Sequence, residues 1–246
     1  MKIIQPYAKI ITESFGSPLI RIEEAAKISH RSEDTIKEDS AERFVRDVIV
    51  RRGDWSVTEH VSITVEMMVD RGITHELVRH RLFSYTQEST RFVNYEKKMP
   101  PSFIYPKPGE ECEWCLKGDE PENHGYGWRH YWGGIDHQNA PNCHHQAQWL
   151  TAIDELEQAY KDLLGEGWRP QEARSVLPNA LASKIWMTGN LRNWRHFFLM
   201  RTTKEAHPQM RQVTIPLLAE FQKVIPVLYE DIEPGASQIE NARKAR

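Results

Sequence analysis

The segment Ser62–Val69 carries an apolar side chain at every second position. These positions are Ile63, Val65, Met67 and Val69. Successive side chains of a β-strand point to opposite faces, so the alternation predicts a strand with one face against a core. Helical patterns surround it, at Leu19–Ser29, Ala41–Arg52 and Ala147–Gly165. A chain that combines such helices with a half-buried strand is expected to form a mixed α/β fold.

The last third of the chain contributes two more predicted elements. Leu181–Thr188 has the composition of a second strand, and Thr214–Tyr229 has the apolar spacing of a final helix. Pro226 is expected to end that helix early, because proline cannot donate the helical hydrogen bond. Near the start of the chain, Gly53 is placed to cap the helix Ala41–Arg52.

Composition excludes several classes of protein. A chain of 246 residues can bury roughly 70% of its unfolded surface, so it needs no disulfide staple. A net charge of −3 argues against a general nucleic-acid binder. Three cysteines suit a reducing compartment. No signal peptide and no membrane-spanning apolar run is evident. We therefore expect a cytoplasmic protein that binds neither nucleic acid nor membrane.

The stretch Arg79–Phe92 concentrates side chains that bind phosphate and planar rings. It contains three arginines, a histidine and two serines, and arginine offers a planar fork of donors that also stacks on rings. If Ile73–Leu82 is one helix, Arg81 falls within its apolar side, while Arg79 points the other way. A buried arginine is costly unless an anion pairs with it. The pattern therefore favours a ligand site over a solvated charge run.

Four polar motifs follow one another along the chain. They are Gly53-x-x-Ser-x-x-Glu-His60, Arg79-His-Arg-x-x-Ser84 continuing to Glu88-Ser-x-Arg91, Ala173-Arg-x-x-Leu-Pro178, and Asn190-x-Arg192 followed by Arg201. This ordered set resembles the signatures of the flavin-dependent thymidylate synthases. The chain departs from that pattern at Thr86, Gln87 and Phe92, where the family has Asn, Glu and Tyr.

The resemblance implies a fold, a reaction and partners. It implies a mostly antiparallel sheet flanked by helices in a single domain spanning residues 1–246. The implied reaction is the reductive methylation of dUMP to dTMP. 5,10-Methylenetetrahydrofolate would supply the methylene group and NADPH the hydride, through FAD. The implied assembly is a homotetramer whose sites form where subunits meet.

The resemblance also implies roles for individual residues. Arg201 is the implied catalytic residue, which lies against the uracil edge and favours its N3-ionised form, so that C5 becomes nucleophilic. Arg91 and Arg174 are implied to bind the nucleotide phosphate. The implied dUMP-binding set is Glu76, Arg79, Gln87, Glu88, Ser89, Thr90, Arg91, Arg174 and Arg201. The implied FAD-binding set is His60, Ser62, Arg79, His80, Arg81, Gln87, Asn190, Arg192 and His196.

A segment at about residues 99–147 is rich in proline, glycine and tryptophan, and it holds all three cysteines. Cys112, Cys115 and Cys143, with nearby histidines, are compatible with tetrahedral zinc, although a second close pair is missing. We interpret the segment as a loop insertion that the family core does not require. Pro141-Asn-Cys143-His faintly resembles the nucleophile segment of the cysteine-dependent thymidylate synthases, and we interpret this as coincidence.

Two alternatives to the synthase hypothesis stay open. The family often has Gln where this chain has Glu76, and Glu76, Thr86 and Gln87 are implied to sit near the base. These departures are compatible with flavin-dependent one-carbon transfer to another pyrimidine nucleotide. The cysteine and histidine cluster is compatible with a non-enzymatic, zinc-dependent interaction module.

Overall fold

The computed structural model describes residues 1–12, 17–37, 39–95, 100–106 and 144–237. These residues form two compact units. The first unit comprises Met1–Ile4 and Ser89–Leu181, and the second comprises Gln5–Glu88 and Ala182–Arg246. Within the described residues, no helix is long and apolar enough to cross a membrane.

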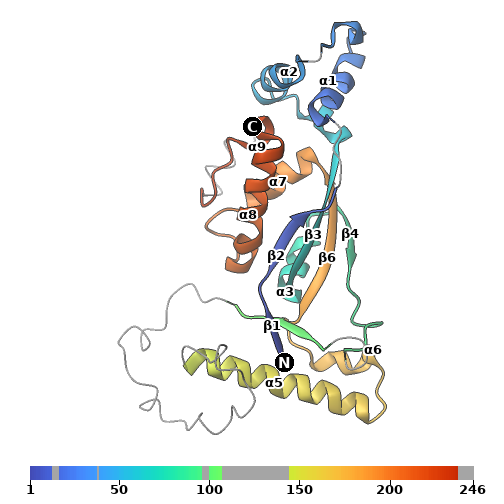
Figure 1. Cartoon of the computed structure of the whole chain (residues 1–246), viewed down its shortest axis with the longest axis vertical. Coiled ribbons are helices and arrows are strands. Elements are labelled where there is room, and N and C mark those ends of the chain that lie inside the picture. Colours follow the sequence, from blue (N-terminus) through green and yellow to red (C-terminus); the bar gives the residue numbers. More distant parts are fainter. Residues whose placement is uncertain (13–16, 38, 96–99, 107–143, 238–246) are drawn as a thin grey trace. The chain divides into compact units, whose positions relative to one another are not determined.

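A four-stranded antiparallel sheet organises the second unit (Figure 1). Its strands, in spatial order, are β2 (Tyr7–Ile10), β3 (Ser62–Asp70), β6 (Ala182–Asn190) and β4 (Ser84–Gln87). The two long central strands pair along their whole length, from Ser62 opposite Asn190 to Asp70 opposite Ala182. The mixed fold with a mostly antiparallel sheet, as expected from the sequence, is confirmed.

The described helices of the second unit range from 4 to 17 residues in length. They are α1 (Pro18–Ile28), α2 (Ala41–Phe44), α3 (Arg71–Leu77), α7 (Leu191–Arg201), α8 (Pro208–Val224) and α9 (Pro226–Tyr229). Three further turns are the 3-10 segment η1 (Glu33–Thr35), the π-helical segment η2 (Val45–Val50) and the 3-10 segment η3 (Trp55–His60). The predicted helix Ala41–Arg52 is therefore α2 continued by η2. Gly53 follows at a φ of 81° and donates its N–H to Ile49, as expected of a cap.

The first unit contains the small parallel sheet β1 (Lys2–Ile4) and β5 (Ser102–Ile104). Its long helix α5 (His144–Gly165) confirms the prediction for Ala147–Gly165, and α6 (Pro170–Ala173) and the 3-10 turn η7 (Arg174–Val176) follow. Its core is a small cluster of buried side chains, consisting of Tyr95, Phe103, Ile153, Tyr160, Ala173 and Leu181.

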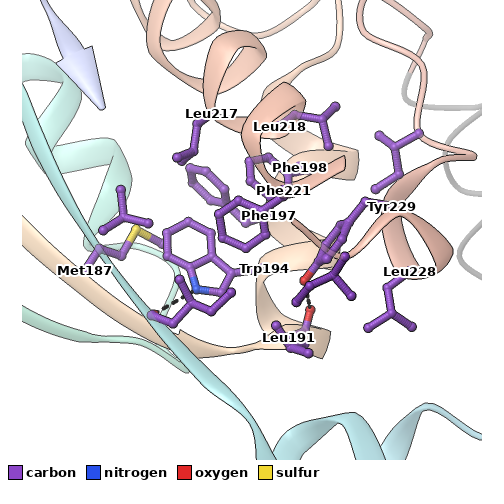
Figure 2. Close-up of a cluster of buried hydrophobic side chains, with 14 of the residues drawn as sticks. Met187, Leu191, Trp194, Phe197, Phe198, Leu217, Leu218, Phe221, Leu228 and Tyr229 are labelled. Carbon is purple, nitrogen blue, oxygen red and sulfur yellow. Dashed lines mark hydrogen bonds between the residues drawn. The ribbon is translucent and has the colours of Figure 1, made fainter. Parts of the chain in front are cut away.

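The core of the second unit lies between the sheet and α7 and α8. The predicted inward residues of β3 are fully buried in it. Figure 2 shows Trp194, Phe197 and Phe198 of α7 packed with aromatic residues of α8 and α9. Two buried hydrogen bonds pin the cluster: the Trp194 indole N–H donates to the Ile63 carbonyl at 3.1 Å, and the Tyr229 hydroxyl donates to the Leu191 carbonyl at 2.9 Å. This packing fixes α7 against the sheet.

The opposite face of the sheet carries one buried carboxylate. Glu66 accepts hydrogen bonds from the Trp186 indole and the Tyr7 hydroxyl, both at 3.0 Å, and its carboxylate lies 3.0 Å from the Lys9 ammonium. Lys9 and Trp186 stand directly opposite Glu66 on the two neighbouring strands. These donors hold the pKa of Glu66 at about 2, below its usual value of 4.5, with the Trp186 hydrogen bond as the largest cause.

Both long strands run directly into helices. Asp70 ends β3 and caps α3, accepting from the Ile73 N–H at 2.7 Å. Asn190 ends β6 and caps α7 in the same way, accepting from the Asn193 N–H at 2.8 Å. A short polar side chain at this position satisfies a helix donor that would otherwise lack a partner. No connecting residue separates strand from helix at either junction.

The condition on which Arg81 would be buried, one helix over the whole of Ile73–Leu82, is not met. Helix α3 ends at Leu77, and Arg81 is exposed. Two tighter turns follow the helix, since the Arg79 N–H donates to the Glu76 carbonyl and the His80 N–H donates to the Leu77 carbonyl. The Tyr85 hydroxyl then donates to the carbonyls of Leu77 and His80 at 2.6 and 2.9 Å. The argument from a buried Arg81 therefore does not hold.

Candidate active site

Arg201 lies at the end of α7 and is held by two acceptors. Its Nε donates to His80 Nε2 at 2.8 Å, and its Nη1 lies 3.0 Å from Glu76 Oε2. The Thr214 hydroxyl donates to the Arg201 backbone carbonyl at 2.8 Å. The Arg201 side chain is 20% exposed and that of Glu76 is 37% exposed. The guanidinium is therefore fixed in direction yet open to a ligand.

His80 serves Arg201 as a neutral acceptor. Burial, the Arg201 charge and His196 lower the pKa of His80 to about 4. Since Nε2 accepts from Arg201, the ring proton of the neutral imidazole belongs on Nδ1. The ring packs edge-to-face on Phe197 at 5.0 Å and on Phe83 at 6.4 Å between centroids. Nε2 of His80 therefore accepts a hydrogen bond from Arg201, and the Nδ1–H can donate to another acceptor.

A glycine on β6 makes room for the segment that carries His80. The pairing of Ser84 with Thr188 makes Phe83 and Gly189 the next opposed positions. A Cβ at Gly189 would lie less than 3.0 Å from Cε1 and Cδ1 of the Phe83 ring. The ring also packs on Trp194 at 4.9 Å. Phe83 therefore anchors the Arg-His-Arg segment, because its ring packs over Gly189, which has no side chain.

The Gln87 side chain on β4 makes hydrogen bonds to other side chains of the second unit. Its amide nitrogen donates to the hydroxyls of Thr74 and Ser183, both at 3.0 Å. Ser183 and Thr74 are buried. A carboxylate at this position could accept from both hydroxyls but could not donate to them. The chain's glutamine therefore suits its surroundings as an uncharged side chain.

A hollow of about 670 Å³ opens in the second unit beside α7. Three of the predicted FAD residues line it, namely Asn190, Arg192 and His196. The rest of its lining consists of Trp55, Glu59, Leu82, Asn193, Arg195 and Leu199. Arg192 pairs with Glu59 at 2.7 Å, and the Asn193 amide donates to the Leu82 carbonyl at 2.9 Å. The hollow combines hydrogen-bond donors with apolar walls, as ligand pockets do.

The other predicted residues of the second unit do not line this hollow. His60, Ser62, Arg79 and Arg81 are exposed. The Glu88 N–H donates to the Lys184 carbonyl at 2.9 Å and so continues the pairing of β4 with β6. The exposed arginines and histidine remain available to bind anionic groups of a ligand.

The predicted phosphate residues gather in the first unit. Arg174 Nη1 donates to the Thr90 hydroxyl at 2.9 Å. The Ser89 hydroxyl accepts from the Arg91 backbone N–H at 3.2 Å, and the Arg91 guanidinium lies 5.4 Å from the centre of the Phe92 ring. Arg174 and Arg91 are both exposed. Hydroxyl and guanidinium donors in one cluster suit a phosphate.

Sequence reasoning missed residues that only three-dimensional pairing identifies. Arg195 is buried, makes a bidentate ion pair with Asp231 at 2.6 and 2.7 Å, and lies 4.5 Å from the Trp55 ring centre. Glu59 stood within the Glu-His motif without a predicted role, and its pairing with Arg192 gives it one. Neither partner is close in sequence, so no local pattern signals these contacts.

The zinc candidates Cys112, Cys115 and Cys143 lie outside the described residues. Among the residues that the structure describes, no group of three or more His, Cys, Asp or Glu side chains could hold a metal ion.

Comparisons with known proteins agree on a family. The family model Thy1, described as thymidylate synthase complementing protein, matches residues 11–227. The flavin-dependent thymidylate synthase of Mycobacteroides abscessus is 31% identical over 229 residues, which cover 90% of this chain and 82% of that protein. The corresponding protein of Mycobacterium tuberculosis H37Rv is 34% identical over 190 residues, covering 75% of this chain and 67% of that one.

A solved structure has a similar fold. The UMP/dUMP methylase PolB from Streptomyces cacaoi, bound with 5-Br dUMP, superimposes with a TM-score of 0.68 at 24% identity. The superposition covers 94% of this chain and 96% of that one.

Proposed function

Because the chain belongs to the family of flavin-dependent thymidylate synthases, we propose that it catalyses the reductive methylation of dUMP to dTMP. The methylene donor is 5,10-methylenetetrahydrofolate, and NADPH is the reductant, through FAD. The observation that carries the proposal is the fixed, partly exposed Arg201, held by His80 and Glu76 in the same unit as the hollow beside α7.

Arg201 is the residue we assign to the base. A uracil ring becomes nucleophilic at C5 as negative charge builds on N3 and its flanking carbonyls. A guanidinium that is already oriented stabilises such charge without reorganising during the reaction. His80 and Glu76 supply that orientation, because they take Nε and Nη1 of Arg201. Arg79 and Gln87 complete the proposed base-side set.

Arg174 and Arg91 are the residues we assign to the nucleotide phosphate. Thr90 is already bonded to Arg174, and Ser89 to the Arg91 backbone. Two guanidinium groups and two hydroxyls offer enough donors for the three oxygens of a phosphate monoester. Glu88, next to this cluster in the chain, remains in the proposed substrate set.

The residues of the hollow fit a flavin. Asn190, Arg192 and His196 supply hydrogen-bond groups, while Leu82, with the other apolar lining residues, supplies surface for a planar ring. Its volume of about 670 Å³ lies in the range of small-molecule sites. We assign to the same cofactor the exposed His60, Ser62, Arg79 and Arg81, and the His80 Nδ1–H. When bound, FAD would transfer reducing equivalents from NADPH toward the one-carbon unit.

The visible absorbance spectrum of the purified protein tests this proposal. We expect an oxidised-flavin spectrum that bleaches anaerobically with NADPH, faster when dUMP is present. Arg201→Ala should keep the flavin spectrum and lose dTMP formation, whereas Arg43→Ala, at an exposed surface position, should change neither the spectrum nor the activity. A protein that binds no flavin when FAD is added would refute the proposal.

A second candidate is one-carbon transfer to another pyrimidine nucleotide. The ion pair of Glu76 with Arg201 bears on this option, since a carboxylate beside the base can accept a hydrogen bond from an exocyclic amino group as well as from the N3–H of uracil. Turnover of dUMP, UMP and dCMP under identical conditions, with product masses, separates the two candidates.

We further propose that the enzyme works as a homotetramer in the cytoplasm. Light scattering coupled to size-exclusion chromatography would measure the mass of the assembly. A monomer at working concentration would refute this part of the proposal without touching the chemistry.

A further inference from the structure

The Glu76 carboxylate lies beside the Arg201 guanidinium, so a ligand that binds Arg201 also lies near Glu76. Glu76 and His80 occupy the Nη1 and Nε sides of the guanidinium, at 3.0 and 2.8 Å. The hydrogens that remain lie on Nη2 and on the other side of Nη1. Because Glu76 is itself 37% exposed, a ring that bonds to the rest of the fork lies next to the Glu76 carboxylate as well. The two side chains together present a donor next to an acceptor.

This arrangement has different consequences for the two protonation forms of a uracil ring. The neutral ring offers an N3–H donor between two carbonyl acceptors, which matches an acceptor beside a donor. The N3-ionised ring offers acceptors alone. An ionised carboxylate cannot donate a hydrogen bond and repels a second negative charge, so Glu76 opposes the form that Arg201 favours.

We propose that Glu76 is a specificity-determining residue that makes this site bind uracil nucleotides with N3 protonated. Glu76 accepts the N3–H, and Arg201 donates to the adjacent carbonyl. The inference rests on the proposed function, since it requires that Arg201 face the base. It adds that the charge of Glu76 restrains ionisation of the bound ring until the reaction draws electrons toward C5.

Glu76 and Arg201 are the charged groups that decide between the neutral and the N3-ionised form of the bound ring, since the neighbouring His80 and Tyr85 are neutral. His80 follows α3 and stays neutral above pH 5, because its pKa is lowered to about 4. Tyr85 on β4 is also neutral, since burial raises its pKa. His196 on α7 faces His80 and is exposed. Among the described residues around the guanidinium, Glu76 is the carboxylate bonded to it.

The test counts the protons released when a nucleotide binds. The probe is 5-bromo-dUMP, because the halogen withdraws electrons and brings N3 ionisation closer to neutral pH. Calorimetric titration of the FAD-loaded protein, in buffers of different ionisation enthalpy, gives the number of protons released per nucleotide. At a pH below the N3 pKa of free nucleotide, the native protein should release almost none.

The isosteric variant Glu76→Gln should reverse this behaviour. Removing the carboxylate should lower the N3 pKa of the bound ring by about 1 to 3 units, so binding should release up to about one proton at the same pH. Glu76→Asp keeps the charge and should behave like the native protein. Glu42→Gln removes a surface carboxylate at a distance and serves as the matched control.

The outcomes separate the inference from the proposed function. Release of a full proton by the native protein, or equal release by Glu76→Gln and the native protein, would overturn the inference alone. Failure of both proteins to bind either dUMP or 5-bromo-dUMP would overturn the proposed function together with it.

Discussion

Replacing Gly189 with alanine should disturb the protein more than the same change at Gly165, Gly167 or Gly235, where a new Cβ meets nothing within 4 Å. The new Cβ would lie less than 3.0 Å from two atoms of the Phe83 ring and 3.1 Å from a third. Carbon atoms in ordinary contact are about 3.5–4.0 Å apart, so the ring would have to move. Trp194 and Phe197, with ring centres 4.9 and 6.1 Å away, limit that movement.

The cost follows from overpacking. Inserting a methyl group into such a packed position costs about 1–3 kcal/mol. For a chain of this length, roughly 2–4 °C of Tm is lost per kcal/mol, which gives a drop of about 2–12 °C. Because Phe83 lies between His80 and β4, the variant should also weaken nucleotide binding by displacing the imidazole that holds Arg201.

Thermal and urea unfolding would measure this effect. The matched control is Gly165→Ala at the end of α5, where a new Cβ meets nothing within 4 Å. This control should change stability by less than about 1 kcal/mol, with alanine the better helix former. In the double variant Gly189→Ala, Phe83→Leu, the smaller side chain should recover part of the loss. Strictly additive effects in that cycle, or a Gly189→Ala protein as stable as the native one, would refute the steric argument.

Three further predictions concern single contacts. Tyr229→Phe removes the buried hydroxyl bonded to the Leu191 carbonyl and should cost about 0.5–1.5 kcal/mol, whereas an unchanged urea midpoint would show that this bond contributes nothing. Glu66 has a folded pKa of about 2 against 4.5 in its ordinary state, so its stabilising effect is complete above pH 4.5 and is lost as the pH falls toward 2. Glu66→Gln should therefore flatten Tm against pH in that window, and an unflattened curve would contradict the assignment. Arg201→Lys should raise the KM for dUMP or abolish turnover, since one ammonium cannot reproduce the fork bonded to His80 and Glu76, and native kinetics in this variant would argue against that geometry.

The parts of the fold that could be predicted from sequence are those with a strong period. The alternation over Ser62–Val69 identified β3 and its buried face, and the helical spacing over Ala147–Gly165 identified most of α5. Strand β4 was missed, because Ser84–Gln87 lies inside a polar motif and has no apolar alternation. Its strand geometry comes from pairing with β6, about a hundred residues away, which no local window can show.

The candidate site likewise has one part that could be predicted from sequence and one part that could not. The motif positions could be predicted, since their residue types and order are distinctive. Their mutual contacts could not, because the bonds of Arg201 to His80 and of Gln87 to Ser183 join residues far apart in sequence. The point at which the helix beginning at Arg71 ends could not be predicted for a related reason. The Tyr85 hydroxyl, which approaches from β4, donates to the carbonyl of Leu77, where α3 ends, and to that of His80 just beyond it.

The junctions at Asp70 and Asn190 make the site sensitive to chain length. Strand and helix meet there without a spacer. A residue inserted in the first turn of α7 would rotate everything after it by about 100°, carrying Arg201 away from its acceptors while the composition stayed the same. A side-chain replacement at either junction can have a small effect on the site, whereas an insertion or deletion shifts every residue that follows. Homologues and engineered variants that keep this chemistry should therefore differ in which residues stand around both junctions, but hardly at all in how many residues these segments contain.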